Sequence, residues 1–202
     1  GRTSRSMAEM ADQLEKAGFA VINQGYPSTD HPVEKLADAA ISDAVAACRR
    51  NRAKTIHFVT HSMGGILVRS YLKDHALPEL GRVVMISPPN QGSEVVDTFG
   101  NLFIFKWVFG PAGQQLSTGK NSLPNTLGPV DFPLGVIAGD FSFNPVLSLI
   151  IPGDDDGKVA VKRTKTAGMT DFIRVDASHT FIMKNEAAIS QAIAFLKGGR
   201  FQ

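Results

Sequence analysis

The strongest constraint on the fold is a serine that lies where a predicted strand runs directly into a predicted helix. Residues Thr55–Thr60 form a short apolar run typical of a buried strand, and residues Gly64–His75 have the periodicity of a helix. Ser62 occupies the turn between them, where the backbone is strained and the side chain projects above the sheet. Strand and helix nearly touch at such a turn, so small flanking residues are needed. Gly64 meets this need, whereas the β-branched Thr60 requires extra room.

Two interpretations of Ser62 are open. Serine is a good helix N-cap, so the residue can simply begin the helix. A cap needs neither the following pair Gly64-Gly65 nor a strand directly before it, which favours a nucleophile. In that interpretation the amide of Met63, at the start of the helix, donates a hydrogen bond to the oxyanion, aided by the helix dipole.

Segments with strand and helix patterns alternate along the chain. The predicted strands are Phe19–Asn23, Thr55–Thr60, Arg82–Ser87, Leu134–Ala138 and Asp171–Ala177. The predicted helices cover Met7–Leu14, Val33–Cys48, Gly64–His75 and Lys184–Lys197. This alternation predicts an α/β fold with a mostly parallel sheet and helices on both faces. The length suits a single domain, residues 1–202, in which the irregular segment 90–131 is a lid-like or cap insertion.

Composition excludes several classes of protein. The net charge is only +2 and no segment is dense in Lys or Arg, so we expect no nucleic-acid partner. The longest oily segment, 102–109, contains Lys106 and is too short to cross a membrane. The single cysteine, Cys48, has no intramolecular disulfide partner and is expected on the buried face of its helix. No signal peptide is visible, which leaves a cytoplasmic location, or a periplasmic or secreted one if a leader was removed upstream.

A serine nucleophile needs a general base, and His179 is the best candidate among five histidines. It follows the last predicted strand and precedes the closing helix, although a solvated loop histidine is the alternative. His57 lies within a predicted buried strand and is expected to have a satisfied ring. His61 is expected to point to the other side of the turn from Ser62.

The acid that orients the base is expected in the loop Gly153–Val159, after the penultimate strand. Asp156 is preferred because Gly157 follows it and ordered structure resumes at Val159. The alternative acids are Asp154, Asp155 and, more remotely, Asp140. The loop is also compatible with a solvated acidic turn. A calcium loop is disfavoured because Arg163 stands where that motif requires Glu.

These motifs resemble those of bacterial lipases and esterases of the α/β-hydrolase superfamily. The resemblance rests on the elbow Thr60–Gly65, the Pro-x-x-Gly-Ser segment within Pro88–Ser93, the Gly-x-x-Asp-x-x-Val pattern of Gly153–Val159, the base loop Ser178–Phe181, and Gly1–Ser4, which is similar to the tail of a His-Gly-x-Gly loop. The acid-loop pattern places the acid on Asp156.

The resemblance implies a serine hydrolase that cleaves carboxylic esters of short or medium acyl chain through an acyl-enzyme on Ser62. It implies a small-molecule or lipid ester substrate, and neither a metal nor an organic cofactor. The aromatic residues in the predicted insertion either line the acyl pocket, make transient contact with a lipid surface, or pack on the sheet: Phe103, Phe105, Trp107 and Phe109. Thioesterase, lactonase and acyltransferase activities, and a non-catalytic binding module, are the alternative functions.

The resemblance also implies a strand just before Gly1, between the strands predicted at Phe19–Asn23 and Thr55–Thr60. A second oxyanion donor is implied in the residue before Gly1. We therefore expect either upstream residues or another chain to supply both, and the oligomeric state is left open.

Overall fold

The computed structural model describes residues 4–100 and 110–202. The expectations for Gly1–Thr3 and for the aromatic residues Phe103, Phe105, Trp107 and Phe109 lie outside the described residues.

Four parallel strands form the sheet, in the order β1-β2-β3-β4. The strands are β1 (Ile56–His61), β2 (Leu80–Ile86), β3 (Leu134–Gly139) and β4 (Asp171–Val175). The sequence predicted all four to within two residues at either end. Because every pair is parallel, the carboxyl ends of the strands meet at one edge of the sheet, where side chains from the following loops converge.

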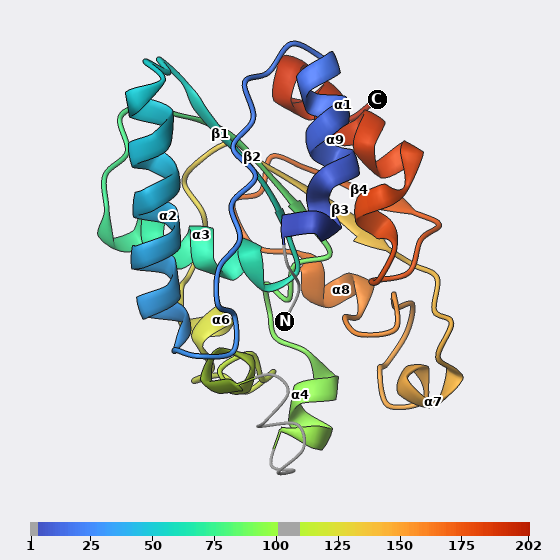
Figure 1. The fold of residues 1–202 in the computed structure, drawn as a ribbon. Helices are drawn as coiled ribbons and strands as arrows, with labels where there is room; N and C mark the ends of the chain where they lie inside the picture. Colours follow the sequence, from blue (N-terminus) through green and yellow to red (C-terminus); the bar gives the residue numbers. More distant parts are fainter. Residues whose placement is uncertain (1–3, 101–109) are drawn as a thin grey trace.

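Helices cover both faces of the sheet (Figure 1). Helices α1 (Ala8–Lys16) and α9 (Glu186–Gly198) share one core with Val84 and Ile86 of β2. Helices α2 (Val33–Arg50) and α3 (Met63–Asp74) lie on the other side, where residues of both helices pack with Val83 and Met85. Alternate residues of β2 thus enter opposite cores, which explains why this strand is apolar throughout its buried part.

The prediction of a strand at Phe19–Asn23 is wrong. These residues belong to no strand, and β1 is the edge strand of the described sheet. Segment 19–26 and β1 instead line a shared cavity of about 470 Å³, together with α1 and α2. An apolar sequence becomes a strand only where a neighbour accepts its backbone hydrogen bonds, and 19–23 forms no ladder with β1.

Segment 90–131, expected to be irregular, contains short helices. Helix α4 (Glu94–Phe99) begins at Ser93, whose side chain accepts the Val95 N–H, and α6 (Leu123–Thr126) has a proline in its first turn. Residues 110–114 are also helical. Capping and a proline at the first turn stabilise helices too short to show a clear hydrophobic period.

Three further short elements lie between the strands and near the chain end. They are α7 (Pro145–Ser148), α8 (Val161–Thr164) and the 3₁₀ helix η2 (Ile182–Lys184).

Cys48 is half-buried and packs against the core that contains Val83, and burial raises the pKa of its thiol. Within residues 4–100 and 110–202, no helix has the length and apolar character needed to cross a bilayer.

Candidate active site

The turn at Ser62 has the strained geometry that its sequence predicts. Ser62 has φ 55° and ψ −128°, directly between the end of β1 and the start of α3. Ser62 is the N-cap residue of α3, but its side chain makes no capping hydrogen bond, so the helix does not use its hydroxyl as a cap. A Cβ at Gly64 would lie 3.3 Å from Cβ of Thr60, a tight contact, so glycine suits the place where strand and helix meet. The amide of Met63 is the first of α3 and follows Ser62 directly.

His179 lies between Ser62 and Asp156. Its Nε2 is 2.9 Å from Oγ of Ser62, and its Nδ1 is 2.8 Å from Oδ2 of Asp156. An ionised carboxylate can only accept, so Nδ1 donates and Nε2 is left to accept the hydroxyl proton of Ser62. This tautomer suits a base that removes the proton of a serine.

Asp156 is buried but remains well suited to carry a charge. Its Oδ1 accepts hydrogen bonds from the N–H groups of Lys158 at 3.0 Å and Val159 at 2.9 Å. Burial raises the pKa of Asp156, but the charge and hydrogen bond of His179, with hydrogen bonds from Ser87 and Val159, outweigh it, so the pKa lies below its ordinary value.

The other carboxylates considered as the acid have different partners. Asp155 is buried and accepts the Gly157 N–H at 2.6 Å and the hydroxyl of Ser148 at 3.0 Å. Asp154 and Asp140 both pair with Arg174, at 2.7 Å and 3.0 Å. Of these four carboxylates, only Asp156 is hydrogen bonded to His179 in the described part of the chain, and the others bind groups of their own surroundings.

The expectation that His61 points away from the site is wrong. Its Nε2 donates to the carbonyl oxygen of His179 at 3.0 Å, and the two rings are 4.7 Å apart. The loop that carries His179 therefore contacts the end of β1, although the two segments are far apart in the sequence. His57 behaves as predicted, since its Nδ1 accepts the Arg82 N–H at 2.8 Å; burial chiefly lowers its pKa.

Ser87, at the end of β2, was not singled out by its sequence. It is fully buried, has φ 47°, and donates its N–H to Ile137 at 2.8 Å. Its hydroxyl accepts the Gly139 N–H at 3.3 Å and is hydrogen bonded to Asp156. A positive φ is costly for serine, so this position supports Asp156 at the expense of local strain. No sequence signal marks it beyond its place at a strand end.

Gly139 allows the acid and base loops to meet at the end of β3. A Cβ at this position would lie 2.3 Å from the carbonyl oxygen of Ala177 and 3.0 Å from Cβ of Asp156. Any side chain would therefore push apart the backbone segments that carry Asp156 and His179.

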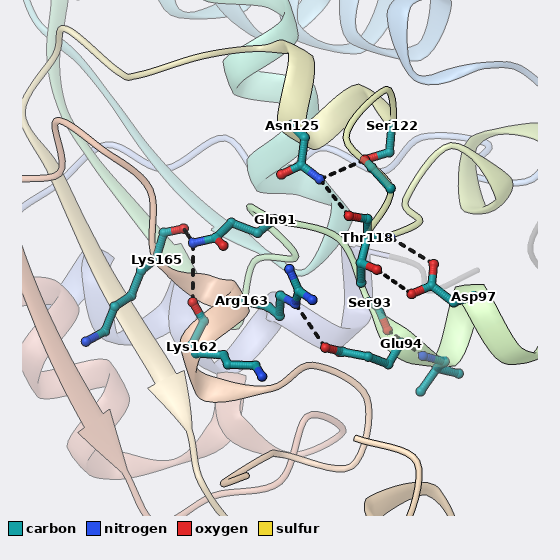
Figure 2. Close-up of polar contacts among 12 residues, drawn as sticks. Gln91, Ser93, Glu94, Asp97, Thr118, Ser122, Asn125, Lys162, Arg163 and Lys165 are labelled. Carbon is teal, nitrogen blue, oxygen red and sulfur yellow. Dashed lines mark hydrogen bonds and ion pairs between the residues drawn. The ribbon is translucent and has the colours of Figure 1, made fainter. Parts of the chain in front are cut away.

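The Pro88–Ser93 segment contacts the Gly153–Val159 loop and the residues that follow it. The hydroxyl of Ser93 donates to the carbonyl oxygen of Lys158 at 2.6 Å. Arg163 and Glu94 form an ion pair at 2.9 Å (Figure 2). Nε2 of Gln91 also donates to the carbonyl oxygen of Lys165 at 3.0 Å. The same figure shows the bonds that tie the following segment together, which involve Asp97, Thr118, Ser122 and Asn125.

The cavity beside β1 is distinct from this site, because Ser62, Asp156 and His179 do not line it. In residues 4–100 and 110–202, no group of His, Cys, Asp or Glu side chains is arranged to hold a metal ion.

No protein-family model matches the chain, and no curated protein sequence matches it. Several solved structures do. The chain is similar to the mature lipase BlEst2 of Bacillus licheniformis, with a TM-score of 0.71 and 20% identity over 91% of this chain and 82% of that one. It is also similar to phospholipase PlaB of Legionella pneumophila, with a TM-score of 0.64 and 20% identity over 82% and 43%.

A third similar structure is a thermophilic esterase of Thermogutta terrifontis, with a TM-score of 0.61 and 15% identity over 98% of this chain and 86% of that one. The chain spans less than half of PlaB and of the propeptide form of BlEst2. Together with the parallel sheet covered on both faces, these likenesses establish that the chain has the α/β-hydrolase fold predicted from its sequence.

Proposed function

We propose that this chain, which has the α/β-hydrolase fold, hydrolyses carboxylic esters of short to medium acyl chain, with Ser62 as nucleophile. The observation that carries the proposal is the unbroken line of contacts from Ser62 through His179 to Asp156, at 2.9 Å and 2.8 Å. The named lipases, esterase and phospholipase among the similar structures support the same reaction class.

In the acylation step, Oγ of Ser62 attacks the ester carbonyl while Nε2 of His179 takes the hydroxyl proton. The carbonyl oxygen becomes an oxyanion that accepts a hydrogen bond from the Met63 N–H at the start of α3. Asp156 stabilises the imidazolium and holds its tautomer. The C–O bond to the alcohol then breaks, His179 returns the proton to the departing alcohol, and the acyl group remains on Ser62.

In the deacylation step, His179 removes a proton from water, and the resulting hydroxide attacks the acyl carbonyl. Collapse of the second oxyanion releases the carboxylic acid, and the proton returns to Ser62. The cycle consumes one ester and one water and needs no metal or organic cofactor.

A fluorophosphonate probe tests the proposal, because it reacts with a serine only when that serine is activated by a base. We expect a single adduct in the intact mass, mapped to Ser62 by peptide mass spectrometry, and hydrolysis of p-nitrophenyl butyrate. Ser62→Ala should abolish the adduct and lower turnover by several orders of magnitude, on the order of 10⁶-fold, as for other serine triads.

Ser178→Ala is the matched control. Ser178 lies beside His179, and its buried Oγ has no hydrogen-bond partner among the described residues. This variant should keep both labelling and turnover. The absence of an adduct on folded wild-type protein, or a Ser62→Ala variant that keeps more than about a tenth of turnover, rules out Ser62 as the nucleophile.

A further inference from the structure

The residue before the nucleophile binds the backbone of the base. Nε2 of His61 donates to the carbonyl oxygen of His179 at 3.0 Å. At the other end of the same residue, the N–H of His179 donates to the carbonyl oxygen of Asp156 at 2.8 Å. Both polar backbone groups of His179 are therefore bound, one to the strand that leads to Ser62 and one to the loop that carries Asp156.

The His61 end of this contact belongs to a rigid part of the sheet. His61 is the last residue of β1 and is paired with Ile86 of β2. The next N–H along the chain, that of Ser62, donates to the carbonyl oxygen of Ile86 at 2.9 Å. A functional group is placed most precisely when its support belongs to a strand or a helix. Because Ile86 fixes both His61 and Ser62, the bond from His61 sets the position of His179 relative to Ser62.

The two imidazole rings also lie against each other. Their centroids are 4.7 Å apart, and their planes are inclined at 49°. His179 is only 4% exposed, so the ring of His61 helps to enclose a base that solvent scarcely reaches. The contact with His61 therefore restricts both the backbone and the ring of His179.

This contact does not depend on the hydroxyl of Ser62. In the free site, Oγ of Ser62 lies 2.9 Å from Nε2 of His179, and that bond itself helps to place the ring. In the proposed acyl-enzyme, Oγ is esterified and has no proton to donate. One of the contacts that place the ring is then lost, whereas the bond from His61 to the carbonyl oxygen of His179 involves no reacting atom.

We propose that His61 is a positioning residue that holds His179 beside the acyl group during deacylation. The proposal rests on the proposed ester hydrolysis and adds to its mechanism. In that step Nε2 of His179 takes a proton from water, and the resulting hydroxide attacks the acyl carbon. The bond from that carbon to Oγ of Ser62 breaks, and Nε2 returns the proton to Oγ. His61 transfers no proton and acts only through the position of Nε2.

Two substitutions of His61 separate the reach of its side chain from its polarity. His61→Gln keeps an N–H donor at about the distance of Nε2 from the backbone. His61→Asn keeps the same amide one methylene shorter, too short to reach the carbonyl oxygen of His179. Both variants keep a polar side chain at the end of β1, so a difference between them reports on the hydrogen bond.

Rapid mixing with p-nitrophenyl butyrate measures the two chemical steps separately, because acylation releases nitrophenol in an initial burst and deacylation sets the later steady rate when the acyl-enzyme accumulates. His61→Asn should slow deacylation by between about tenfold and 10²-fold, since a misplacement of about 1 Å can cost that much. Acylation should slow much less, and the intact mass during turnover should show the acyl adduct on most of the protein. His61→Gln should restore the wild-type rates.

His57→Leu is the matched control. His57 lies on the same strand and lines the same cavity as His61, and its ring accepts the Arg82 N–H. This variant removes a histidine and a hydrogen bond of β1 that does not involve the base. It should lower the free energy of unfolding and leave both rate constants unchanged. Urea unfolding of all the variants identifies any loss of activity that comes from unfolding.

Proton NMR follows the position of the base without turnover. The Nδ1–H of His179, which Asp156 accepts, should give a resolved resonance in wild type, His61→Gln and His57→Leu, because the enclosed proton exchanges slowly with water. In His61→Asn this resonance should be lost to exchange.

Retention of the resonance or of the deacylation rate in folded His61→Asn overturns the proposal. Equal slowing of acylation and deacylation also overturns it, because the contact then has no particular part in the acyl-enzyme stage. A His61→Gln variant as slow as His61→Asn overturns the hydrogen bond as the cause. If folded wild type does not hydrolyse the ester, the proposed function fails and the deacylation role with it, but loss of the resonance in His61→Asn still shows that His61 holds the base.

Discussion

Asp156 and His179 are joined twice. Oδ2 of Asp156 lies 2.8 Å from Nδ1 of His179, and the backbone N–H of His179 donates to the carbonyl oxygen of Asp156, also at 2.8 Å. The side-chain contact fixes the tautomer of the imidazole, and the backbone bond fixes the loop that carries it. The acid and base loops therefore behave as one unit at the carboxyl edge of the sheet.

The three neighbouring aspartates should respond differently to substitution by asparagine. Asp156→Asn should lower kcat by up to about 10⁴-fold, because an asparagine there can favour the wrong tautomer of His179. Asp155→Asn should chiefly lower the free energy of unfolding, because Asp155 is buried and holds Gly157 and Ser148. Asp154→Asn, at an exposed position, should change little. Ester kinetics and urea unfolding on each variant measure both effects, and a larger kcat loss for Asp155→Asn moves the acid by one residue.

Ser87 should act through Asp156. Ser87→Ala and Ser87→Gly both remove the hydroxyl and should lower kcat equally, by about tenfold or more, with KM unchanged, since a hydrogen bond to a charged group contributes about 1.5–3 kcal/mol. Their stabilities should differ, because glycine relieves the positive φ and alanine does not; we expect the glycine variant to be about 1 kcal/mol more stable. In an Asp156→Asn background the Ser87 substitutions should have little further effect on kcat. Equal losses in both backgrounds assign Ser87 a purely structural role.

Ser93 should stabilise the acid loop from a distance. Ser93→Ala removes both the cap of α4 and the bond to the carbonyl oxygen of Lys158, and should lower the free energy of unfolding by about 1–2 kcal/mol. Ser122→Ala is the control, because Ser122 also precedes a short helix, α6, but makes no capping bond; its hydroxyl only accepts Nδ2 of Asn125 at 3.1 Å. Denaturant titration compares the two variants. Equal destabilisation by both substitutions would mean that the two hydrogen bonds of Ser93 contribute no more to the free energy of unfolding than the hydroxyl of Ser122 does.

The depressed pKa of Asp156 makes its contribution to stability dependent on pH. The pKa of Asp156 in the folded chain lies below its ordinary value of 3.8, so between these two pKa values the unfolded chain binds more protons than the folded one. The stability due to this group is therefore complete above about pH 4 and is lost as the pH falls through the folded pKa. The difference in unfolding free energy between wild type and Asp156→Asn should therefore shrink as the pH falls below about 4. Urea titrations at stepped pH measure it, and parallel curves for the two proteins contradict the ionised, stabilised carboxylate.

Much of the fold and of the candidate site was predictable because the relevant signals are local. The strands and helices around Ser62 adjoin each other in sequence, so their hydrophobic periods also located the strained turn. Asp156 and His179 were predictable as members of loops that follow strands, since the carboxyl ends of parallel strands meet at one edge.

Other features depended on contacts between distant segments. Phe19–Asn23 has a strand-like sequence but lacks a ladder partner in the described sheet, and no local pattern reports on a partner. The contact of His61 with His179 and the bond of Ser87 to Asp156 each join residues that are far apart in the sequence. The sequence of segment 141–152 is equally compatible with a core segment, and only the tertiary structure exposes Phe141, Phe143, Val146 and Leu149 while it buries Ile151. Sequence thus determined the elements and the order of the site residues through local backbone preferences, whereas packing between distant segments decided which side chains touch the base and which face solvent.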